Sequence, residues 1–145
     1  MKIAFACLLT LTSTFSTLAA TLTVEVHDIK STKGDIVVTV YNSSKTWLED
    51  GKKNIVKQHV VNLKDKVIEG VLITQIELPE GEYALQIYQD WDQNKEMDSN
   101  WIGMPKEPVA TSNNAKGSMG PPSYKDAKFT LSESGTTQIV NIVDI

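Results

Sequence analysis

The chain has 145 residues, with 18 acidic and 14 basic side chains, and every basic one is a lysine. A mildly acidic protein without arginine is a poor candidate for binding nucleic acid or anionic lipid. The length fits one domain of ordinary size.

The first twenty residues predict a secretory signal peptide. Lys2 supplies a positive charge, residues 3–11 are apolar, and small residues lead to acceptable cleavage sites after Ala19 and Ala20. The apolar run is too short to span a membrane. We therefore expect export to the periplasm or the extracellular space.

Residues 21–145 are expected to form a single exported domain. Loss of Lys2 leaves 13 lysines against 18 acids, a net charge of −5. Cys7 is the only cysteine, so the exported domain has no disulfide and must be stabilised by its core. No later apolar run reaches the length of a membrane span, so we expect no membrane insertion after signal cleavage.

Alternation of apolar and polar side chains predicts a series of short strands. Residues 21–28 alternate strictly, residues 36–41 are rich in β-branched side chains, and Lys33-Gly34 between them is a turn signal. These two strands are therefore predicted to pair as a hairpin. Further strands are expected over residues 55–63 (with a helical turn as the alternative), 67–78 (interrupted at Gly70), 83–88, 127–131 and 137–143.

The number of strands and the lack of an amphipathic helical pattern predict an all-β fold, an antiparallel β-sandwich of about seven strands. Residues 104–125 contain four of the five prolines and are predicted to form a long ordered loop layer at one end. Apolar side chains are expected to anchor this layer to the sandwich. The expected anchors are Trp101, Ile102, Met104, Val109, Met119 and Tyr124.

The strand that begins at Tyr83 leads into a loop with an oxygen-bearing side chain at every second position. These residues are Asp90, Asp92, Asn94, Glu96 and Asp98. Calcium binds six to eight oxygens, so the loop is a candidate Ca²⁺ site, with Glu96 contributing its backbone carbonyl. It is not an EF-hand, because Lys95 replaces the central glycine and Trp101 replaces the final glutamate.

Two questions about this loop stay open at the level of sequence. Glu107 could complete the set of ligands, but nothing in the sequence places it there. The alternative to a metal site is an exposed turn in which the Asp and Asn side chains bond to their own backbone. If a cation does bind, the missing final glutamate predicts a weak site, with a Kd on the order of 10⁻⁴ M or poorer.

Aromatic residues near the loop predict a second kind of contact. Trp91, Trp101 and Tyr124 are candidate ligand-contact residues, because an aromatic ring beside polar oxygens suits a carbohydrate. The alternative for Trp101 and Tyr124 is packing of the loop layer onto the sandwich. A glycan or an envelope protein is therefore the expected partner.

Catalysis is not expected. His27 and His59 are the only histidines, they are not at metal-ligand spacing, and no nucleophile motif accompanies them. An uncharacterised hydrolase that uses one of these histidines is the third interpretation, after a binding module and a carbohydrate binder.

Three segments together resemble one family. Residues 78–84 (LPEGEYA), 90–107 and 112–127 are similar to the motifs of DUF2141, a family of secreted bacterial proteins of unknown function. The resemblance implies a β-sandwich of the transthyretin or carboxypeptidase-regulatory kind with no established catalytic activity.

The departures from the family pattern lie in the acidic loop. Gln89 stands where the family has His, Asp92 where it has Asn, and Lys95 where it has Gly. A lysine in a left-handed backbone conformation would cost free energy that glycine avoids.

Overall fold

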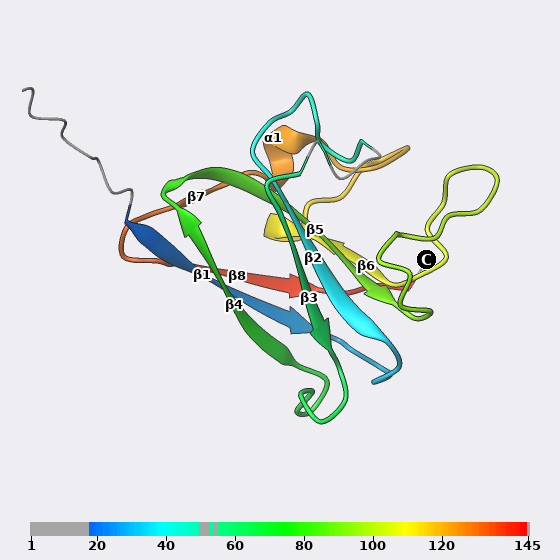
Figure 1. Ribbon diagram of the computed structural model, residues 1–145. Coiled ribbons are helices and arrows are strands. Elements are labelled where there is room, and N and C mark those ends of the chain that lie inside the picture. Colours follow the sequence, from blue (N-terminus) through cyan, green and yellow to red (C-terminus); the bar gives the residue numbers. More distant parts are fainter. Residues whose placement is uncertain (1–17, 50–52, 54, 145) are drawn as a thin grey trace, which may run out of the picture.

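The computed structural model describes residues 18–49, 53 and 55–144, and there eight strands form two packed sheets (Figure 1). One sheet has the order β4-β1-β8, and the other has the order β3-β2-β5-β6, with β7 also paired to β5. The strands are β1 (Ala19–His27), β2 (Asp35–Tyr41), β3 (Lys57–Asn62), β4 (Leu72–Pro79), β5 (Gly81–Asp90), β6 (Val109–Thr111), β7 (Phe129–Leu131) and β8 (Thr136–Asn141). The predicted signal peptide up to residue 17, including Cys7, lies outside the described residues.

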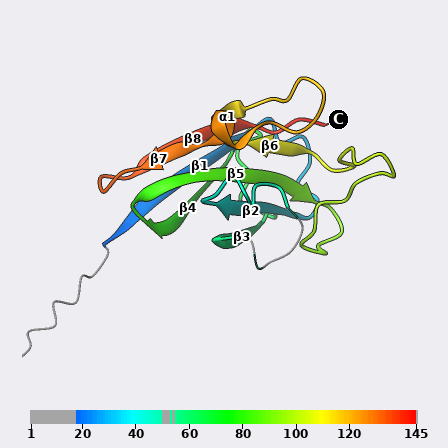
Figure 2. The ribbon, with the colours of Figure 1, turned by 90° about the horizontal axis from the view of Figure 1, so that it is seen from above.

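The predicted all-β sandwich is confirmed. Seen from above, β1 and β8 lie in one layer and β2 and β3 in the other (Figure 2). All strand pairs are antiparallel except β1 with β8, which is parallel. Among the described residues, no helix has the length and apolar character needed to cross a membrane.

The core lies between the two sheets and follows the predicted alternation. In β1 the buried side chains are Leu22, Val24 and Val26, and their neighbours along the strand are only partly buried. Residue 20 is also buried, so β1 begins close to the predicted cleavage sites. The side chains that β2 and β5 contribute to the core are Ile36, Val38, Val40, Tyr83, Leu85 and Ile87.

The predicted hairpin between the first two strands is wrong. β1 pairs with β4 and β8, whereas β2 pairs with β3 and β5 in the other sheet. Both strands direct their apolar side chains into the same core, so they face each other across it. Alternation identifies the buried face of a strand but cannot tell a paired strand from a facing one.

Other strand boundaries differ in ways that the backbone explains. Residues 57–62 form β3, so the strand prediction there is confirmed. Glu69 and Gly70 both have positive φ and form a tight turn, so β4 begins only at Leu72 and the predicted strand is shorter. The expected irregular stretch contains β6, and the short helix α1 (Tyr124–Ala127) lies at its end.

Loops cover the outer face of the larger sheet. All seven residues of β2 are buried although only alternate ones face the core. Trp47 packs edge-on against Tyr41, with ring centroids 5.2 Å apart, so the loop that carries it folds back onto the sheet. The amide nitrogen of Gln86 lies 3.5 Å from the sulfur of Met97, so the acidic loop also reaches over this face.

The prediction that apolar side chains anchor the loop layer is largely wrong. Val109 lies in β6, and the ring of Tyr124 packs against Trp47. The other four are exposed: Trp101 (95%), Ile102 (61%), Met104 (43%) and Met119 (101%). Hydrogen bonds to polar side chains hold these loops instead.

Ser112 is one of these polar anchors. Its hydroxyl accepts from the N–H of Leu85 at 2.8 Å and donates to the carbonyl of Ala127 at 2.5 Å, which ties β5 to α1. Next to it, the amide of Asn113 donates to the carbonyls of Asp126 and Lys128. The segment that resembles the family motif in this region therefore has a structural role.

Two tyrosines provide a matched test of this polar anchoring. The hydroxyl of Tyr83 donates to the carbonyl of Pro79 at 2.9 Å, whereas the buried hydroxyl oxygen of Tyr124 has no hydrogen-bond partner among the residues that the structure describes. Tyr83→Phe is expected to lower the free energy of unfolding by about 1 kcal/mol in a urea melt. Tyr124→Phe should leave it unchanged or raise it, because no hydrogen bond is lost. Equal losses in the two variants would contradict this assignment.

Candidate metal centre

The candidate site forms where β5 ends. Tyr88 pairs with Val109 of β6, and the pairing continues as the N–H of Gln89 donates to the carbonyl of Pro108 at 2.9 Å. The same register brings Glu107 beside Asp90. Two carboxylates that are far apart in sequence therefore become cross-strand neighbours, an arrangement that destabilises a sheet unless the charges are compensated.

Three carboxylates meet at this point. One oxygen each from Asp90, Asp92 and Glu107 lies within 4.8 Å of the other two. Asp90 is fully buried and Glu107 is 4% exposed, whereas Asp92 is open to solvent. This group of three is referred to below as the carboxylate cluster.

Backbone amides compensate the two buried carboxylates. Asp90 accepts from the N–H of Asn94 at 3.2 Å and from that of Lys95 at 2.7 Å. Glu107 accepts from the N–H of Trp91 at 2.8 Å and from that of Asp98 at 3.2 Å. The acidic loop thus wraps around the cluster and presents its amides to it.

Among the residues that the structure describes, no cationic side chain forms an ion pair with the cluster. The ion pairs formed by the described residues are His27–Glu25, Lys30–Asp144 and Lys128–Glu82, all of them elsewhere. Buried carboxylates in proteins are usually paired with a cation or coordinate a metal. The donor set, all oxygen, suits a hard cation such as calcium.

The pKa of Glu107 is raised above its ordinary value of 4.5, chiefly because burial disfavours the charged form. The N–H groups of Trp91 and Asp98 lower it, and the charges of Asp90 and Asp98 raise it further.

This shift predicts the sign of a pH effect. The folded state holds the Glu107 proton more tightly than the unfolded state does. The resulting stabilisation is fully present below pH 4.5 and is lost as the pH rises through the raised pKa. In the presence of a chelator, urea melts above pH 4.5 should therefore show stability falling more steeply with pH in the wild type than in Glu107→Gln. Parallel curves for the two proteins would contradict the prediction.

The remaining predicted ligands lie outside the cluster. The side-chain amide of Asn94 donates to Asp92 and Asp98, both at 3.2 Å. Its oxygen accepts from the N–H of Glu96 at 2.7 Å, and the carboxylates of Glu96 and Asp98 are not part of the group of three. The exposed part of the loop therefore forms side-chain-to-backbone bonds, as predicted for a turn without metal. Its buried part instead brings carboxylates together, as predicted for a metal site.

The loop backbone has positive φ angles, including at Lys95, where the family pattern has glycine. Lys95 has φ 63° and Gln93 has φ 61°, both in the left-handed region. A non-glycine residue there costs about 1–2 kcal/mol. The bonds that Lys95 and its neighbours make to the cluster offset this cost.

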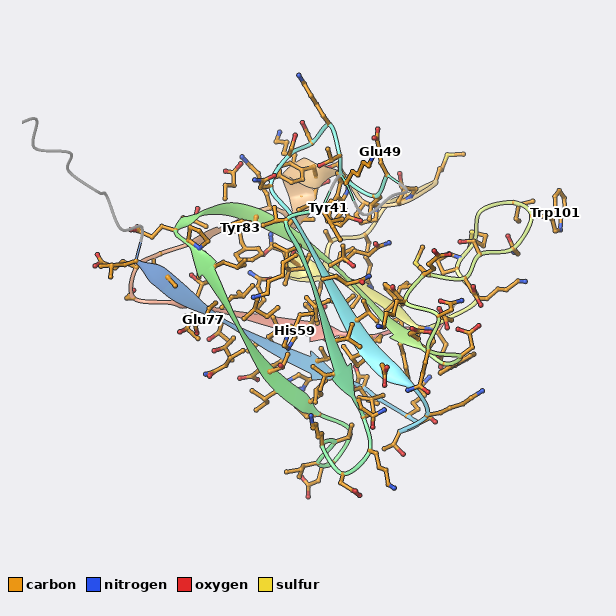
Figure 3. The ribbon with its side chains drawn as sticks, in the orientation of Figure 1. Tyr41, Glu49, His59, Glu77, Tyr83 and Trp101 are labelled. Carbon is orange, nitrogen blue, oxygen red and sulfur yellow. The ribbon has the colours of Figure 1, made fainter. Side chains whose placement is uncertain are left out.

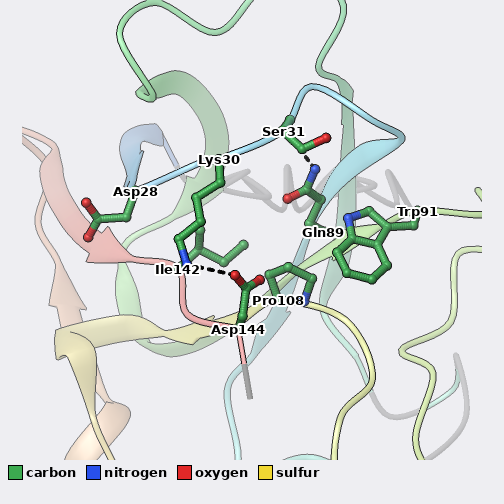
Figure 4. A pocket seen from close by; sticks show the side chains of 8 residues that line it. All are labelled: Asp28, Lys30, Ser31, Gln89, Trp91, Pro108, Ile142 and Asp144. Atoms are coloured by element: carbon green, nitrogen blue, oxygen red, sulfur yellow. Dashed lines mark hydrogen bonds and ion pairs between the residues drawn. The ribbon is translucent and has the colours of Figure 1, made fainter.

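The candidate ligand-contact aromatics are not brought together. Trp91, 38% exposed, lines a shallow pocket of about 230 Å³ beside Gln89 (Figure 4). Trp101 points away from the body of the molecule (Figure 3). Tyr124 packs against Trp47 instead, in line with the packing alternative.

The polar groups of the pocket are bonded to the protein. Gln89 donates to the carbonyls of Ser31 and Lys33 at 2.8 Å each, and Lys30 pairs with Asp144 at 2.8 Å. The ammonium of Lys33 lies 5.7 Å from the centre of the Trp91 ring. A ligand here would have to use the ring itself or displace these bonds.

The two histidines lie in different sheets. His59 of β3 is 2.8 Å from the hydroxyl of Thr74, and burial lowers its pKa. His27 of β1 is 3.4 Å from Glu25.

The structure places Glu107 in the candidate site. Comparison with known proteins identifies the family of the chain. Residues 24–139 match the family model DUF2141, described as an uncharacterized protein conserved in bacteria. No curated protein and no solved structure matches the chain.

Proposed function

The chain belongs to the DUF2141 family of bacterial proteins, and from that premise we propose that it is an exported, non-enzymatic binding module whose acidic loop holds a calcium-type cation. The cation is held by Asp90, Asp92 and Glu107 and stabilises the part of the acidic loop that surrounds them. Export follows from the signal peptide predicted in residues 1–20.

One observation carries the proposal. Asp90 and Glu107 are buried side by side, and no lysine in the described part of the chain forms an ion pair with either. Asp92 supplies a third oxygen from the solvent side. A cation would replace mutual repulsion by attraction to all three oxygens, with water completing its shell from the side of Asp92. Carboxylate oxygens also favour calcium over softer metals.

The test is calcium titration by calorimetry, with a thermal melt at each concentration. It uses the chain from residue 18 onward, which contains every described element. At a tenfold excess of calcium over Kd, the folded state should gain about 1.4 kcal/mol. Asp92→Asn should remove both the heat and the stabilisation, whereas Glu96→Gln should keep them, because Glu96 lies outside the cluster. No saturable heat up to several millimolar calcium would refute the proposal.

A second candidate function is carbohydrate binding at the pocket beside Trp91. The observation that favours it is the exposed indole ring at the edge of a pocket that also has amide and carboxylate groups. Soluble glycans should then change the tryptophan fluorescence of the wild type. Trp91→Ala should abolish the change, whereas Trp101→Ala should keep it; no response to any glycan would exclude this function.

A further inference from the structure

Residues 99–105, which follow the acidic loop and are called its tip below, carry three of the exposed large apolar side chains of the described residues. Trp101 is 95% exposed, Ile102 61% and Met104 43%, all within four residues. Figure 3 shows the Trp101 ring standing clear of the sandwich. Exposed apolar groups that lie together mark an interaction site far more often than scattered ones do.

The tip is held in this shape by its own hydrogen bonds. Asn100 accepts, through its side-chain oxygen, from the N–H groups of Ile102 and Met104, both at 3.0 Å. Its backbone N–H donates to the carbonyl of Met104 at 2.8 Å, and Ser99 pairs with Pro105 below the turn. The apolar side chains are therefore presented by a closed turn whose backbone is already ordered before binding.

From this geometry we infer that residues 99–105 dock the protein onto the surface of a zwitterionic phospholipid bilayer, with Trp101 and Ile102 entering the headgroup region. The tip projects from the body of the molecule and carries three exposed large apolar side chains. A stable protein complex buries roughly 800 Å² on each partner, from about 20–30 residues, so the tip alone is too small for one. A bilayer requires no matching concave surface, and tryptophan is the side chain that prefers its interface.

The net negative charge of residues 91–107 favours a zwitterionic lipid over an anionic one. Residues 91–107 contain four acidic side chains and two lysines, a net charge of −2. An anionic bilayer would repel this loop at low ionic strength, whereas a zwitterionic one would not. The docking needs no spanning segment and does not depend on the proposed cation.

The experiment is co-sedimentation of the chain from residue 18 onward with vesicles of phosphatidylcholine or of phosphatidylglycerol, with EDTA present. The chelator separates this test from the calcium proposal. The wild type should sediment with phosphatidylcholine, and with phosphatidylglycerol only as salt is raised. Trp101→Ser should weaken the partitioning about tenfold or more. Met119→Ser is the matched control: it also removes a fully exposed apolar side chain but should have no effect.

Three outcomes would overturn the inference. The wild type could fail to sediment with either lipid, which would mean that the tip binds a protein or a glycan instead of a bilayer. It could sediment with phosphatidylglycerol alone, which would make the lysines responsible. Or Met119→Ser could weaken binding as much as Trp101→Ser, which would indicate general adhesion of apolar surface.

Discussion

Gly34→Ala is expected to be among the most destabilising substitutions at a surface turn of this protein, lowering the free energy of unfolding by about 3 kcal/mol. Gly34 has φ 77°, and a Cβ atom there would lie 2.0 Å from the carbonyl oxygen of Asp90. The added Cβ would clash with backbone atoms, so rotation of a side chain cannot relieve the clash. Since Asp90 carries the buried carboxylate, the substitution should also disturb the cluster. A urea melt measures the loss.

Gly120→Ala is the matched control for this prediction. A Cβ atom at Gly120 would meet nothing within 4 Å, and its φ is not in the left-handed region. Its stability should stay within about 0.5 kcal/mol of the wild type. If Gly34→Ala were as mild as Gly120→Ala, the close approach of the two backbones would be wrong.

Glu107→Ala is expected to lower the free energy of unfolding by about 2 kcal/mol and to release the acidic loop. The substitution removes the acceptor for the N–H groups of Trp91 and Asp98. Relief of the repulsion with Asp90 offsets part of this loss. Hydrogen exchange should show both N–H groups losing protection, and a urea melt gives the free energy.

Glu96→Ala is the corresponding control. Glu96 is exposed, and its carboxylate is not part of the cluster. Neither the protection of the two N–H groups nor the stability should change beyond about 0.5 kcal/mol. Unchanged protection in Glu107→Ala would mean that the loop is held by other contacts.

The sequence predicted strands better than it predicted their partners. Alternation identified the buried face of β1, because one face of the strand packs on the core. It could not show that β1 and β2 face each other across the core, since paired and facing strands have the same pattern. Burial of all seven β2 residues was also beyond the sequence, because it depends on loops that fold back from elsewhere.

In the candidate site, too, contacts between residues close in sequence were predicted, whereas contacts that depend on strand pairing were not. Asp90 and Asp92 were predicted because they are close in sequence. Glu107 could only be suggested, because it reaches Asp90 through the register of β6 on β5. Trp101 was expected to be an anchor on hydrophobicity alone, and the turn built by Asn100 exposes it instead. The cost attached to a positive φ at Lys95 was foreseen, and the backbone there has φ 63°.

The central claim, that the carboxylate cluster holds a calcium-type cation, is tested most directly by recording backbone amide NMR spectra during a calcium titration. The amides that donate to Asp90 and Glu107 report on those carboxylates individually: Trp91, Asn94, Lys95 and Asp98. The account predicts that these four resonances shift first and saturate together, with a Kd on the order of 10⁻⁴ M or weaker. Unchanged resonances at these positions, or shifts confined to exposed acids elsewhere, would contradict it.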